Sequence, residues 1–502
     1  MTSLRAKTIA IIGAGPSGLV AAKYLRAEKA FDNIVLFEQR ARSGGIWNYT
    51  PEDRDEDLFT IPQTNPRGRN QDPVWRERVG TYVKSATNGT HGTNGVSKAA
   101  SFLSPVYEKL ETNIPRGLMG FQDLDWPQDS QLFPKHQTVL EYIETYGKEV
   151  EDLVQYETQV IDVQAVDEEH NGKWTVKTRN LRSNSERTDT FDAVIVANGH
   201  FIVPYIPDIE AIREWNAKYP GLISHSKYYR RPEEFEGKKV VVVGNSASGV
   251  DISTQIAAFS QHPILWSSQS SSMFKPGSDT RKRELPPIAK FLPEKRGVVF
   301  EDGTTEHEID AIVFATGYFY SLPFLENVKP ELIGDGSHVQ HTYKHLFYAP
   351  RPTLSFLVLN QRVIPFPVAE AQSAVLARVY SGRLSLPNLS EMVKWEEETI
   401  VENGNGRSFH VLPFPKDGNY INELASWSST ASPQDGLEND GHGKRPPVWG
   451  EWEFWCRENF PAIRGAFGKR GDERFGITKL EELGFNFEEH LKEKAKSEGK
   501  LI

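Results

Sequence analysis

Apolar residues along the chain fall into short runs separated by polar turns, and two groups of these runs share one order. The first group consists of a strand, a turn, a helix and a strand, predicted at Thr8–Ile12, 13–18, Leu19–Lys29 and Asn33–Phe37. Short, β-branched apolar runs of this kind are typical of strands buried on both faces. Residues 7–40 therefore predict a strand–turn–helix–strand unit.

The same order of elements returns between residues 238 and 268. Its strand, turn, helix and second strand are predicted at Lys239–Val243, 244–249, Val250–Phe259 and Pro263–Trp266. A strand followed by a glycine-rich turn and a helix is the unit that binds a dinucleotide through its phosphates. Two such units in one chain predict an α/β fold with two dinucleotide-binding, Rossmann-like domains.

Two further apolar runs end in turns of small residues. Ala193–Val196 is followed by Ala197-Asn198-Gly199-His200, and Ala311–Phe314 is followed by Ala315-Thr316-Gly317-Tyr318. Each pattern predicts a buried strand whose glycine lets the chain leave the sheet. We expect both strands at places where the chain crosses between the two domains.

Polar segments interrupt this framework. Residues 51–104 are rich in Asp, Arg, Pro, Asn and Gly and predict an inserted surface excursion that is partly mobile. Residues 137–148 predict a helix, and residues 427–449 predict a loop. Residues 479–496 mix charges of both signs at roughly helical spacing and predict a solvated helix face, as does Glu396-Glu397-Glu398.

The first glycine turn has the spacing of a dinucleotide-binding fingerprint. Gly13 permits the tight turn, Gly15 lets the backbone approach a pyrophosphate, and Gly18 lets the helix pack close to the strand. Glu38 follows Gly18 by 20 residues, at the end of the second strand. A carboxylate there accepts hydrogen bonds from ribose hydroxyls and repels a 2′-phosphate, which favours FAD or NAD over NADP.

The second turn departs from the fingerprint, because Ser246 replaces the middle glycine between Gly244 and Gly249. No Asp or Glu occurs between Asp251 and Asp279, so the acid that binds a ribose is missing. Hydroxyl, amide and basic side chains stand there instead and suit a 2′-phosphate: Ser267, Ser268, Gln269, Arg281, Lys282 and Arg283. The second site is therefore predicted to bind NADPH.

Composition narrows the classes of function. The formal net charge is −10, which argues against broad binding to nucleic acid or to an anionic membrane. Cys456 is the one cysteine, which excludes an intrachain disulfide, a CxxC redox pair and a thiolate-rich metal site, and we expect it to be a packing residue. No apolar run reaches the about 18 residues of a membrane span, and the N-terminus lacks a signal-peptide pattern. We expect a cytoplasmic protein.

Several motifs together resemble the class B flavin-containing monooxygenases, particularly their soluble fungal members. Residues 219–230 are similar to the family's identifying pattern F-x-G-x-x-x-H-x-x-x-[YF]-[KR], with Tyr219 in place of Phe. Glu38-Gln39-Arg40, followed by Gly44-Gly45-Ile46-Trp47, is similar to the family's second flavin motif. Ala315-Thr316-Gly317-Tyr318 is similar to its A-T-G-Y motif.

The resemblance implies a site as well as a fold. Thr112-Asn113, before Met119, looks like the family's T-N element, and implies that Asn113 is catalytic, holding the flavin peroxide and the nicotinamide ribose by hydrogen bonds. The motifs and the resemblance together imply these cofactor-binding residues: Gly13, Gly15, Pro16, Ser17, Gly18, Glu38, Gln39, Arg40, Gly45, Ile46, Trp47, Thr112, Asn113, Met119, Gly244, Ser246, Ser248, Gly249, Asp251, Ser267, Ser268, Thr316, Gly317 and Gln361. No metal is implied.

The implied reaction uses FAD, NADPH and O2. Hydride passes from NADPH to the flavin, and a C4a-hydroperoxyflavin then gives one oxygen atom to a soft nucleophile, sulfur or nitrogen, of a small molecule. The implied FAD domain is discontinuous, at residues 1–204 and 319–502 with C-terminal helices, and the NADP domain is inserted at 205–318. The expected partners are the small molecule and O2, without nucleic acid or membrane, and the assembly could be a homodimer.

Other interpretations stay open at this point. A Baeyer–Villiger monooxygenase acting on a ketone shares the framework, although its pattern usually ends in Trp where this chain has Tyr229. A flavin-binding NADPH oxidase or scaffold without oxygen transfer shares both turns, whereas a single cysteine disfavours a disulfide reductase. His225 is interpreted as a structural link between the domains, and the spacing of His338, His341 and His345 could suit a metal but lacks a carboxylate partner.

Overall fold

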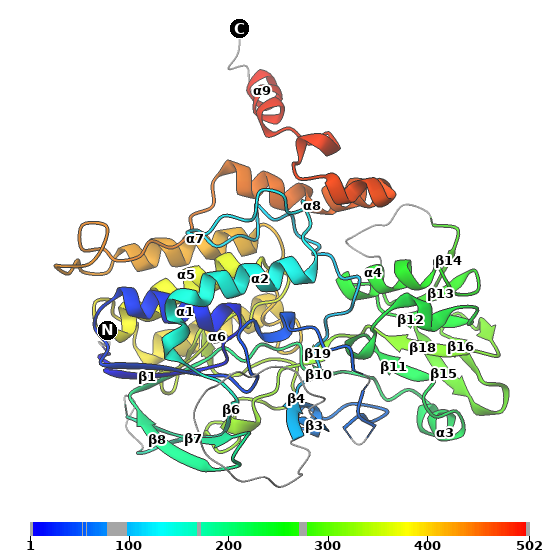
Figure 1. Cartoon of the computed structure of the whole chain (residues 1–502), viewed down its shortest axis with the longest axis horizontal. Helices are drawn as coiled ribbons and strands as arrows, with labels where there is room; N and C mark the ends of the chain where they lie inside the picture. The colour runs from blue at the N-terminus through cyan, green and yellow to red at the C-terminus, as the bar shows by residue number, and fades with distance from the viewer. Residues whose placement is uncertain are drawn as a thin grey trace, which may run out of the picture.

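Two sheets built around parallel strands form the two halves of the protein (Figure 1). This computed structural model describes residues 4–52, 54–56, 58–77, 98–167, 172–270 and 279–497. In spatial order, the seven-stranded first sheet consists of β20 (Thr342–Tyr343), β21 (Phe347–Tyr348), β22 (Leu354–Phe356), β9 (Ala193–Val196), β1 (Thr8–Ile12), β2 (Asn33–Phe37) and β5 (Val154–Gln155).

The five-stranded second sheet interrupts the first along the chain. In spatial order it consists of β11 (Ile223–His225), β18 (Ala311–Phe314), β12 (Val240–Val243), β13 (Ile264–Ser267) and β14 (Lys282–Leu285). Its strands all come between β9 and β22, which are neighbours in the first sheet and pair in parallel. The predicted α/β fold with two Rossmann-like domains, one inserted in the other, is confirmed.

Alternating side chains of β1 divide between two cores on opposite faces of the first sheet. Ile9 and Ile11 belong to the core shared with the helices, whereas Ala10 and Ile12 belong to the core under a three-stranded antiparallel sheet. That sheet consists of β6 (Thr158–Ala165), β7 (Trp174–Asn180) and β8 (Glu186–Phe191). Burial on both faces explains why the sequence reads as an uninterrupted apolar run.

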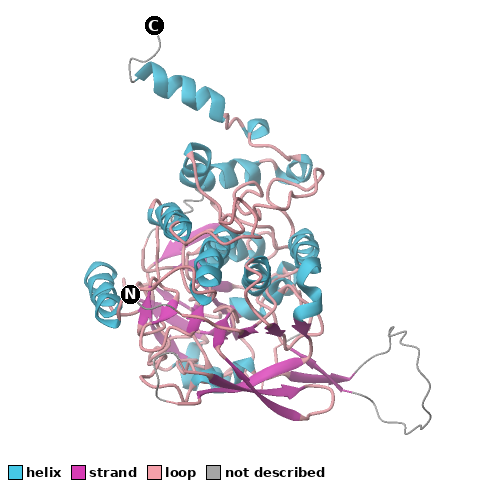
Figure 2. Cartoon of the chain, turned by 90° about the vertical axis from the view of Figure 1, so that its left-hand side faces the viewer, coloured by secondary structure: helices cyan, strands magenta, loops and turns pink. Residues whose placement is uncertain are grey.

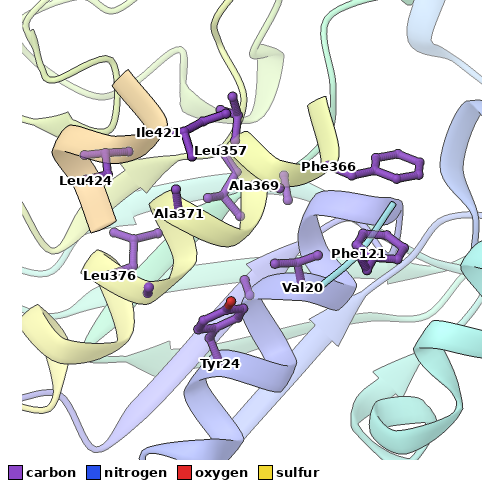
Figure 3. Close-up of a cluster of buried hydrophobic side chains, with 14 of the residues drawn as sticks. Val20, Tyr24, Phe121, Leu357, Phe366, Ala369, Ala371, Leu376, Ile421 and Leu424 are labelled. Carbon is purple, nitrogen blue, oxygen red and sulfur yellow. The ribbon is translucent and has the colours of Figure 1, made fainter. Parts of the chain in front are cut away.

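Helices cover the other face of the first sheet (Figure 1). They are α1 (Pro16–Ala27), α2 (His136–Gly147), α5 (Pro365–Tyr380) and α7 (Lys416–Ser429). In Figure 3, α5 lies between α1 and α7, and the side chains of Val20, Ala369 and Leu424 belong to one continuous apolar cluster. Nearly every residue of α5 is buried, because this helix has neighbours on all sides.

The second sheet is also covered on both faces. On one face lie α3 (Ile212–Lys218) and the antiparallel strands β15 (Ile288–Leu292), β16 (Gly297–Phe300) and β17 (Thr305–Glu306). On the other face lies α4 (Ala247–Ile256), whose Ile252 and Ile256 pack against Val240 and Val242 of β12. This arrangement fits the uninterrupted apolar run of β12.

The chain crosses between the two sheets through a pair of short strands. β10 (Val203–Pro204) follows β9, β19 (Tyr318–Phe319) follows β18, and the two pair antiparallel. The strands predicted at 193–196 and 311–314 therefore do end where the chain passes from one sheet to the other.

The segment 51–104 differs from the expected surface excursion in its first half. Phe59 is buried in the core of the second sheet, and Gln63 is buried as well. The backbone of Gln63 donates to and accepts from Ile206, both at 3.0 Å. This half is a packed strap because it carries a few apolar side chains among its polar ones. Residues 78–97, which include the Thr-, Asn- and Gly-rich run at 87–95, lie outside the described residues.

The remaining elements complete the second half of the chain and the strap. They are β3 (Val74–Glu77), β4 (Lys98–Ser101), α6 (Leu389–Asn403), α8 (Glu451–Lys469), the 3₁₀ helix η8 (Gly471–Gly476) and α9 (Phe487–Ser497). Figures 1 and 2 show α9 reaching away from the rest of the protein, which agrees with the solvated helix predicted at 479–496 from Phe487 onwards, whereas Leu480 is buried in the core. Cys456 of α8 is buried as a packing residue. Among the described residues, no helix is long and apolar enough to span a membrane.

A buried ion pair ties the end of α1 to the segment after α5. Arg383 donates to the Glu28 carboxylate from Nε at 2.8 Å and from Nη2 at 2.7 Å, and both side chains are at most 5% exposed. The hydroxyl of Ser381 donates to the same carboxylate at 3.0 Å. Removal of one charge would leave the other buried without its partner.

We expect Glu28→Gln to lower the free energy of unfolding by about 3–5 kcal/mol, because Arg383 keeps its buried charge and loses a carboxylate. The measurement is urea unfolding of the cofactor-loaded protein. Glu398→Gln is the control, since Glu398 pairs with Lys394 on the exposed surface. Equal urea midpoints for the Glu28 variant and the control would contradict the assignment.

Candidate active site

One cavity of about 2350 Å³ lies between the two sheets. It is lined by residues at the carboxyl ends of strands β1, β9, β12 and β18, which is where α/β sheets bind ligands. Of the cofactor-binding residues expected from the sequence, Gly18 and Gly249 alone do not line it. Those that line it are Gly13, Gly15, Pro16, Ser17, Glu38, Gln39, Arg40, Gly45, Ile46, Trp47, Thr112, Asn113, Met119, Gly244, Ser246, Ser248, Asp251, Ser267, Ser268, Thr316, Gly317 and Gln361.

The first glycine turn is built so that α1 starts directly against it. Gly13 has φ +105°, and a Cβ atom there would lie 2.7 Å from the carbonyl oxygen of Ala197. A Cβ atom on Gly18 would lie 1.9 Å from the carbonyl oxygen of Gly13. The free N–H groups at the start of α1 therefore open on the cavity beside Gly15, which makes a cradle for a pyrophosphate.

Glu38 holds this turn from the end of β2. Its Oε2 accepts from the Ala14 N–H at 2.9 Å and its Oε1 accepts from the Arg40 N–H at 2.8 Å. The side chain is almost fully buried and lines the cavity. Each carboxylate oxygen can accept a further hydrogen bond, so Glu38 fits the hydroxyls of an FAD ribose.

The second turn repeats this geometry. Gly244 has φ +115°, and a Cβ atom there would lie 2.4 Å from the carbonyl oxygen of Ala315. A Cβ atom on Gly249 would lie 2.1 Å from the carbonyl oxygen of Gly244. Ser246 has φ −78° and ψ −173°, close to Gly15 at −74° and −178°. Because this backbone conformation suits any residue, serine can replace the middle glycine.

The basic residues expected to bind a 2′-phosphate each have a partner within the protein. Arg281 donates to Asp279 at 2.9 Å, Lys282 donates to the hydroxyl of Ser253 at 2.8 Å, and Arg283 donates to Glu306 at 2.8 Å. None of the three basic side chains lines the cavity. The side chains of Arg281 and Arg283 are 42% and 47% exposed, and their contact with a 2′-phosphate stays a prediction.

Ser267 and Ser268, by contrast, do reach the cavity at the end of β13. Ser267 is buried and its hydroxyl donates to the carbonyl of Pro286 at 2.9 Å, while the Ser268 hydroxyl donates to the carbonyl of Ser270 at 3.2 Å. Both hydroxyl oxygens can still accept a hydrogen bond. Residues 271–278, which follow directly, lie outside the described residues.

Asn113 lies in the cavity wall on a segment whose neighbours are fixed. The N–H of Thr112 donates to the carbonyl of Pro134 at 2.9 Å, and its hydroxyl donates to the carbonyl of Ile114 at 2.9 Å. Thr112 and Met119 are buried, whereas Asn113 is half-buried. The Asn113 amide makes no hydrogen bond to any residue that the structure describes, so it is available to a ligand.

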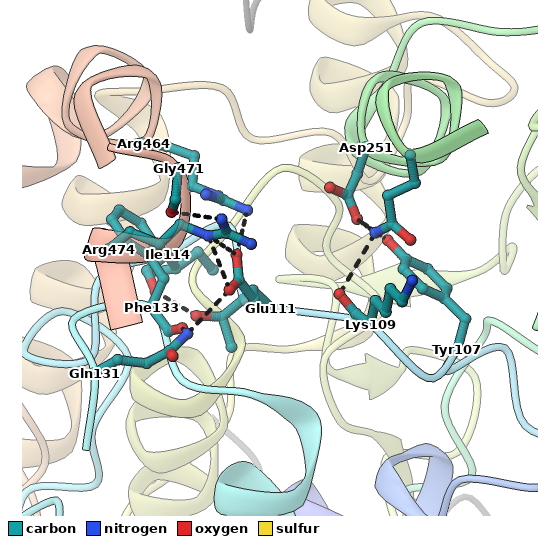
Figure 4. Close-up of polar contacts among 12 residues, drawn as sticks. Tyr107, Lys109, Glu111, Ile114, Gln131, Phe133, Asp251, Arg464, Gly471 and Arg474 are labelled. Atoms are coloured by element: carbon teal, nitrogen blue, oxygen red, sulfur yellow. Dashed lines mark hydrogen bonds and ion pairs between the residues drawn. The ribbon is translucent and has the colours of Figure 1, made fainter. Parts of the chain in front are cut away.

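Asp251 connects α4 to the segment that carries Asn113 (Figure 4). Its Oδ2 accepts from the phenol of Tyr107 and from Nε2 of Gln255, the latter at 3.0 Å. Burial raises the pKa of Asp251 and raises that of Tyr107 well above its usual value. Asp251 thus lines the cavity as expected, but its Oδ2 is already hydrogen-bonded to Tyr107 and Gln255.

His225 connects β11 to the crossing between the sheets. Its Nδ1 accepts from the Lys227 N–H at 3.1 Å, which leaves the proton on Nε2 to donate to the carbonyl of Gly317 at 3.0 Å. Burial lowers the pKa of His225 to about 3, so the ring is neutral. These contacts support the structural interpretation of His225.

The other histidines and the acidic run are packed rather than arranged around an ion. His345 is hydrogen-bonded to His410 at 2.9 Å, and no group of His, Cys, Asp or Glu among the described residues could hold a metal. Glu396 differs from the solvated face expected for it, because an oxygen of its carboxylate accepts from the His341 N–H at 2.5 Å and its side chain is only 13% exposed. Glu397 and Glu398 are exposed as expected.

Sequence reasoning missed the contribution of the C-terminal helices to the cavity. Arg464 of α8 and Arg474 of η8 line the wall beside Glu111, and both form ion pairs with it. More than 350 residues separate the partners along the chain. No local pattern in the sequence signals a contact over such a distance.

Comparison with known proteins identifies related sequences over most of the chain. The profile of flavin-binding monooxygenase-like proteins matches residues 96–279 and 287–430, and that of NAD(P)-binding Rossmann-like domains matches residues 11–77. The flavin-containing monooxygenase FMO GS-OX-like 2 of Arabidopsis thaliana is 34% identical over 434 residues, covering 83% of this chain and 84% of that protein. The flavin-containing monooxygenase ustF2 of Aspergillus flavus is 28% identical over 471 residues, covering 86% and 93%.

Solved structures resemble the whole fold. S-allyl-L-cysteine S-oxygenase from Allium sativum has a TM-score of 0.71 and 29% identity, and the match covers 99% of both chains. Tmm from Pelagibacter sp. strain HTCC7211 has a TM-score of 0.67 and 21% identity, covering 91% of this chain and 90% of that one, and it supports the fold alone.

The two turns allow a paired test of which cofactor each one holds. We expect Gly18→Ala to lose the flavin absorbance of the purified protein, because the added Cβ pushes α1 away from the first turn. We expect Gly249→Ala to keep FAD, because the first turn is unchanged. We expect NADPH to reduce the flavin of this variant at least about tenfold more slowly, since the same clash occurs at the second turn.

Gly476→Ala is the matched control, because a Cβ atom there meets no other atom within 4 Å. Flavin content is read from the visible spectrum, and reduction is followed under anaerobic conditions. Loss of FAD in the Gly249 variant with retention in the Gly18 variant would reverse the assignment.

Proposed function

Because the chain belongs to the flavin-binding monooxygenase-like family, we propose that it transfers one oxygen atom to a soft nucleophile, preferentially the sulfur of a small thioether. The family makes the chain a monooxygenase that uses FAD, NADPH and O2 on a small molecule. Sulfur is favoured over nitrogen because the whole-length relative from Allium sativum is named an S-allyl-L-cysteine S-oxygenase. The reaction consumes NADPH, a proton and O2, and yields the oxygenated product, NADP+ and water.

One observation carries this proposal: both glycine turns open on the same cavity. The amide of Asn113 lies in the wall of this cavity and makes no hydrogen bond to any residue that the structure describes. Residues that line the first turn, the second turn and the Asn113 segment all face this same space. Hydride transfer needs the two cofactors in contact, and oxygen transfer needs the substrate at the same place. A single cavity serves both requirements.

The residues of this chain bind and orient the cofactors. The start of α1 would bind the pyrophosphate of FAD while Glu38 binds its ribose, and the start of α4 would bind the pyrophosphate of NADPH. FAD, when bound, would accept hydride and activate O2, because side chains alone cannot do this chemistry. The protein contributes the close placement of the reactants and the exclusion of water.

Asn113 suits a role beside the reacting atoms for a chemical reason. Its amide can donate and accept hydrogen bonds, yet it does not titrate and offers no strong acid. A strong acid at that place would favour loss of hydrogen peroxide over transfer of oxygen. We therefore assign Asn113 the task of holding the reacting groups in place without protonating them.

We expect Asn113→Ala to keep its FAD and to consume NADPH, but to release hydrogen peroxide instead of oxygenated product. Lost hydrogen bonds of about 1–3 kcal/mol correspond to a fall of about one to two decades in product formed per NADPH. The measurement is the ratio of product to NADPH consumed, with hydrogen peroxide quantified in parallel. Asn327→Ala, on the exposed surface, is the control. If the Asn113 variant formed as much product per NADPH as the wild type, the role assigned to Asn113 would be contradicted.

The proposed function itself is tested with three probes of different chemistry. Purified enzyme with FAD, NADPH and O2 is given methyl phenyl sulfide, N,N-dimethylaniline or cyclohexanone, and products are identified by mass spectrometry. We expect the sulfoxide to form fastest. Formation of the lactone from cyclohexanone as the main product, or consumption of NADPH without any oxygenated product, would overturn the proposal.

A further inference from the structure

The cavity wall beside Asn113 carries two arginines on a single carboxylate (Figure 4). Nη2 of Arg464 lies 3.2 Å from Oε2 of Glu111, and Nε of Arg474 lies 3.2 Å and 3.3 Å from its two oxygens. Gln131 donates to the same carboxylate at 3.3 Å. The cluster therefore holds two positive charges against one negative charge and has a formal charge of +1.

Part of each guanidinium group is not used by these contacts. Arg464 directs Nη2 to Glu111 and has no partner for Nε or Nη1 in the described part of the chain, while its guanidinium lies over the rings of Phe133 and Phe467. Arg474 uses Nε for Glu111 and Nη1 for the carbonyl of Gly471, which leaves Nη2. The two side chains are 20% and 25% exposed, and both line the cavity.

Other cations also line the cavity, and Arg407 among them lies over the rings of Tyr205 and Phe319. Lys109 forms an ion pair with Glu233, and Arg457 forms one with the buried Asp417. Each of these has a carboxylate of its own, whereas Arg464 and Arg474 share Glu111. Planar guanidinium groups with free donors are the side chains that bind carboxylates most specifically in proteins.

The cluster lies close to the amide that we place beside the reacting atoms. Glu111 pairs with Lys135 in an isolated antiparallel bridge, so the backbone is extended there. Two residues of extended chain advance about 7 Å. Glu111 and Asn113 are two residues apart, and both line the cavity, as does Thr112 between them.

We propose that Arg464 and Arg474 bind a carboxylate group of the substrate, so that the enzyme prefers thioethers that carry a carboxylate a few bonds from the sulfur. The inference rests on the proposed S-oxygenation and names its substrate class. The carboxylate stays unchanged, while the sulfur lone pair forms the new S–O bond. The second oxygen atom of O2 leaves as water with the electrons of NADPH. Glu111 opposes the bound carboxylate and limits its affinity.

The test compares 4-(methylthio)butanoate with its neutral amide, 4-(methylthio)butanamide. These probes have the same sulfur and the same chain, so the ratio of their kcat/KM values isolates the charge. We expect the wild type to favour the carboxylate by about tenfold or more, and Arg464→Gln to reduce this ratio towards one. We expect Glu111→Gln to raise the ratio, because the competing carboxylate is gone. Arg470→Gln, at the exposed end of the same helix, is the control and keeps the wild-type ratio.

The two variants are expected to change the ratio of kcat/KM values in opposite directions. This excludes a merely structural role, since damage to the cavity wall would lower the ratio in both variants. A phosphate of NADPH is the other anion that the arginines could bind. In that case Arg464→Gln would raise KM for NADPH and leave the probe ratio unchanged, which would overturn the proposal. A ratio near one in the wild type would overturn it as well.

Binding of hexanoate and hexanamide separates this inference from the proposed function, because neither compound has a sulfur to oxidise. Both are titrated into the FAD-loaded enzyme with NADP+ while the flavin spectrum is followed. Preferential binding of hexanoate that is weakened by Arg464→Gln supports the carboxylate site even where neither thioether yields a sulfoxide. Equal binding of the two compounds contradicts it, whatever the thioethers do.

Discussion

The close packing of each helix start against the glycine turn before it is the constraint on which the rest of the structure depends. At Gly18 and Gly249, a single added carbon would lie about 2 Å from a backbone carbonyl of the same turn. At Gly13 and Gly244, the added carbon would meet the strand end that leads to the other sheet. The glycines therefore fix helix, turn and crossing strand in one unit, and the N–H groups at the helix start face outwards into the cavity.

Two such units face one cavity, and the crossing between them is short. β10 and β19 pair directly, and His225 donates to the backbone of Gly317 beside this pair. The segment that carries Asn113 bridges the two halves, because Tyr107 contacts α4 of the second sheet and Glu111 contacts the C-terminal helices. The proposed positions of the cofactors and the substrate would thus share a single wall.

Much of the fold could be predicted because its signals are local. β1 and β2 have the predicted bounds, since strands buried on both faces are read directly from uninterrupted apolar runs. Helix α1 begins at Pro16 and α4 at Ala247, each three residues before its predicted start, because the end of a glycine turn already belongs to the helix. The turns, Glu38 and Asn113 were placed on the cavity because motifs of fixed spacing carry them.

The parts that could not be predicted depend on contacts between distant segments. Phe59 joins the core of the second sheet although it lies in a segment rich in charged residues, and Glu396 packs against the His341 backbone instead of facing water. Arg281, Lys282 and Arg283 have the right charge for a phosphate but find partners within the protein. Arg464 and Arg474 reach Glu111 only in the folded chain.

The central claim is that one cavity takes hydride from NADPH and transfers one atom of O2 to a nucleophilic substrate. Turnover under ¹⁸O2 tests it most directly, with methyl phenyl sulfide as substrate and with both the product mass and the consumption of NADPH measured. The account predicts one ¹⁸O atom in each sulfoxide molecule and nearly one NADPH consumed for each product. A sulfoxide without ¹⁸O, or NADPH consumed with hydrogen peroxide as the only oxygen product, would contradict it.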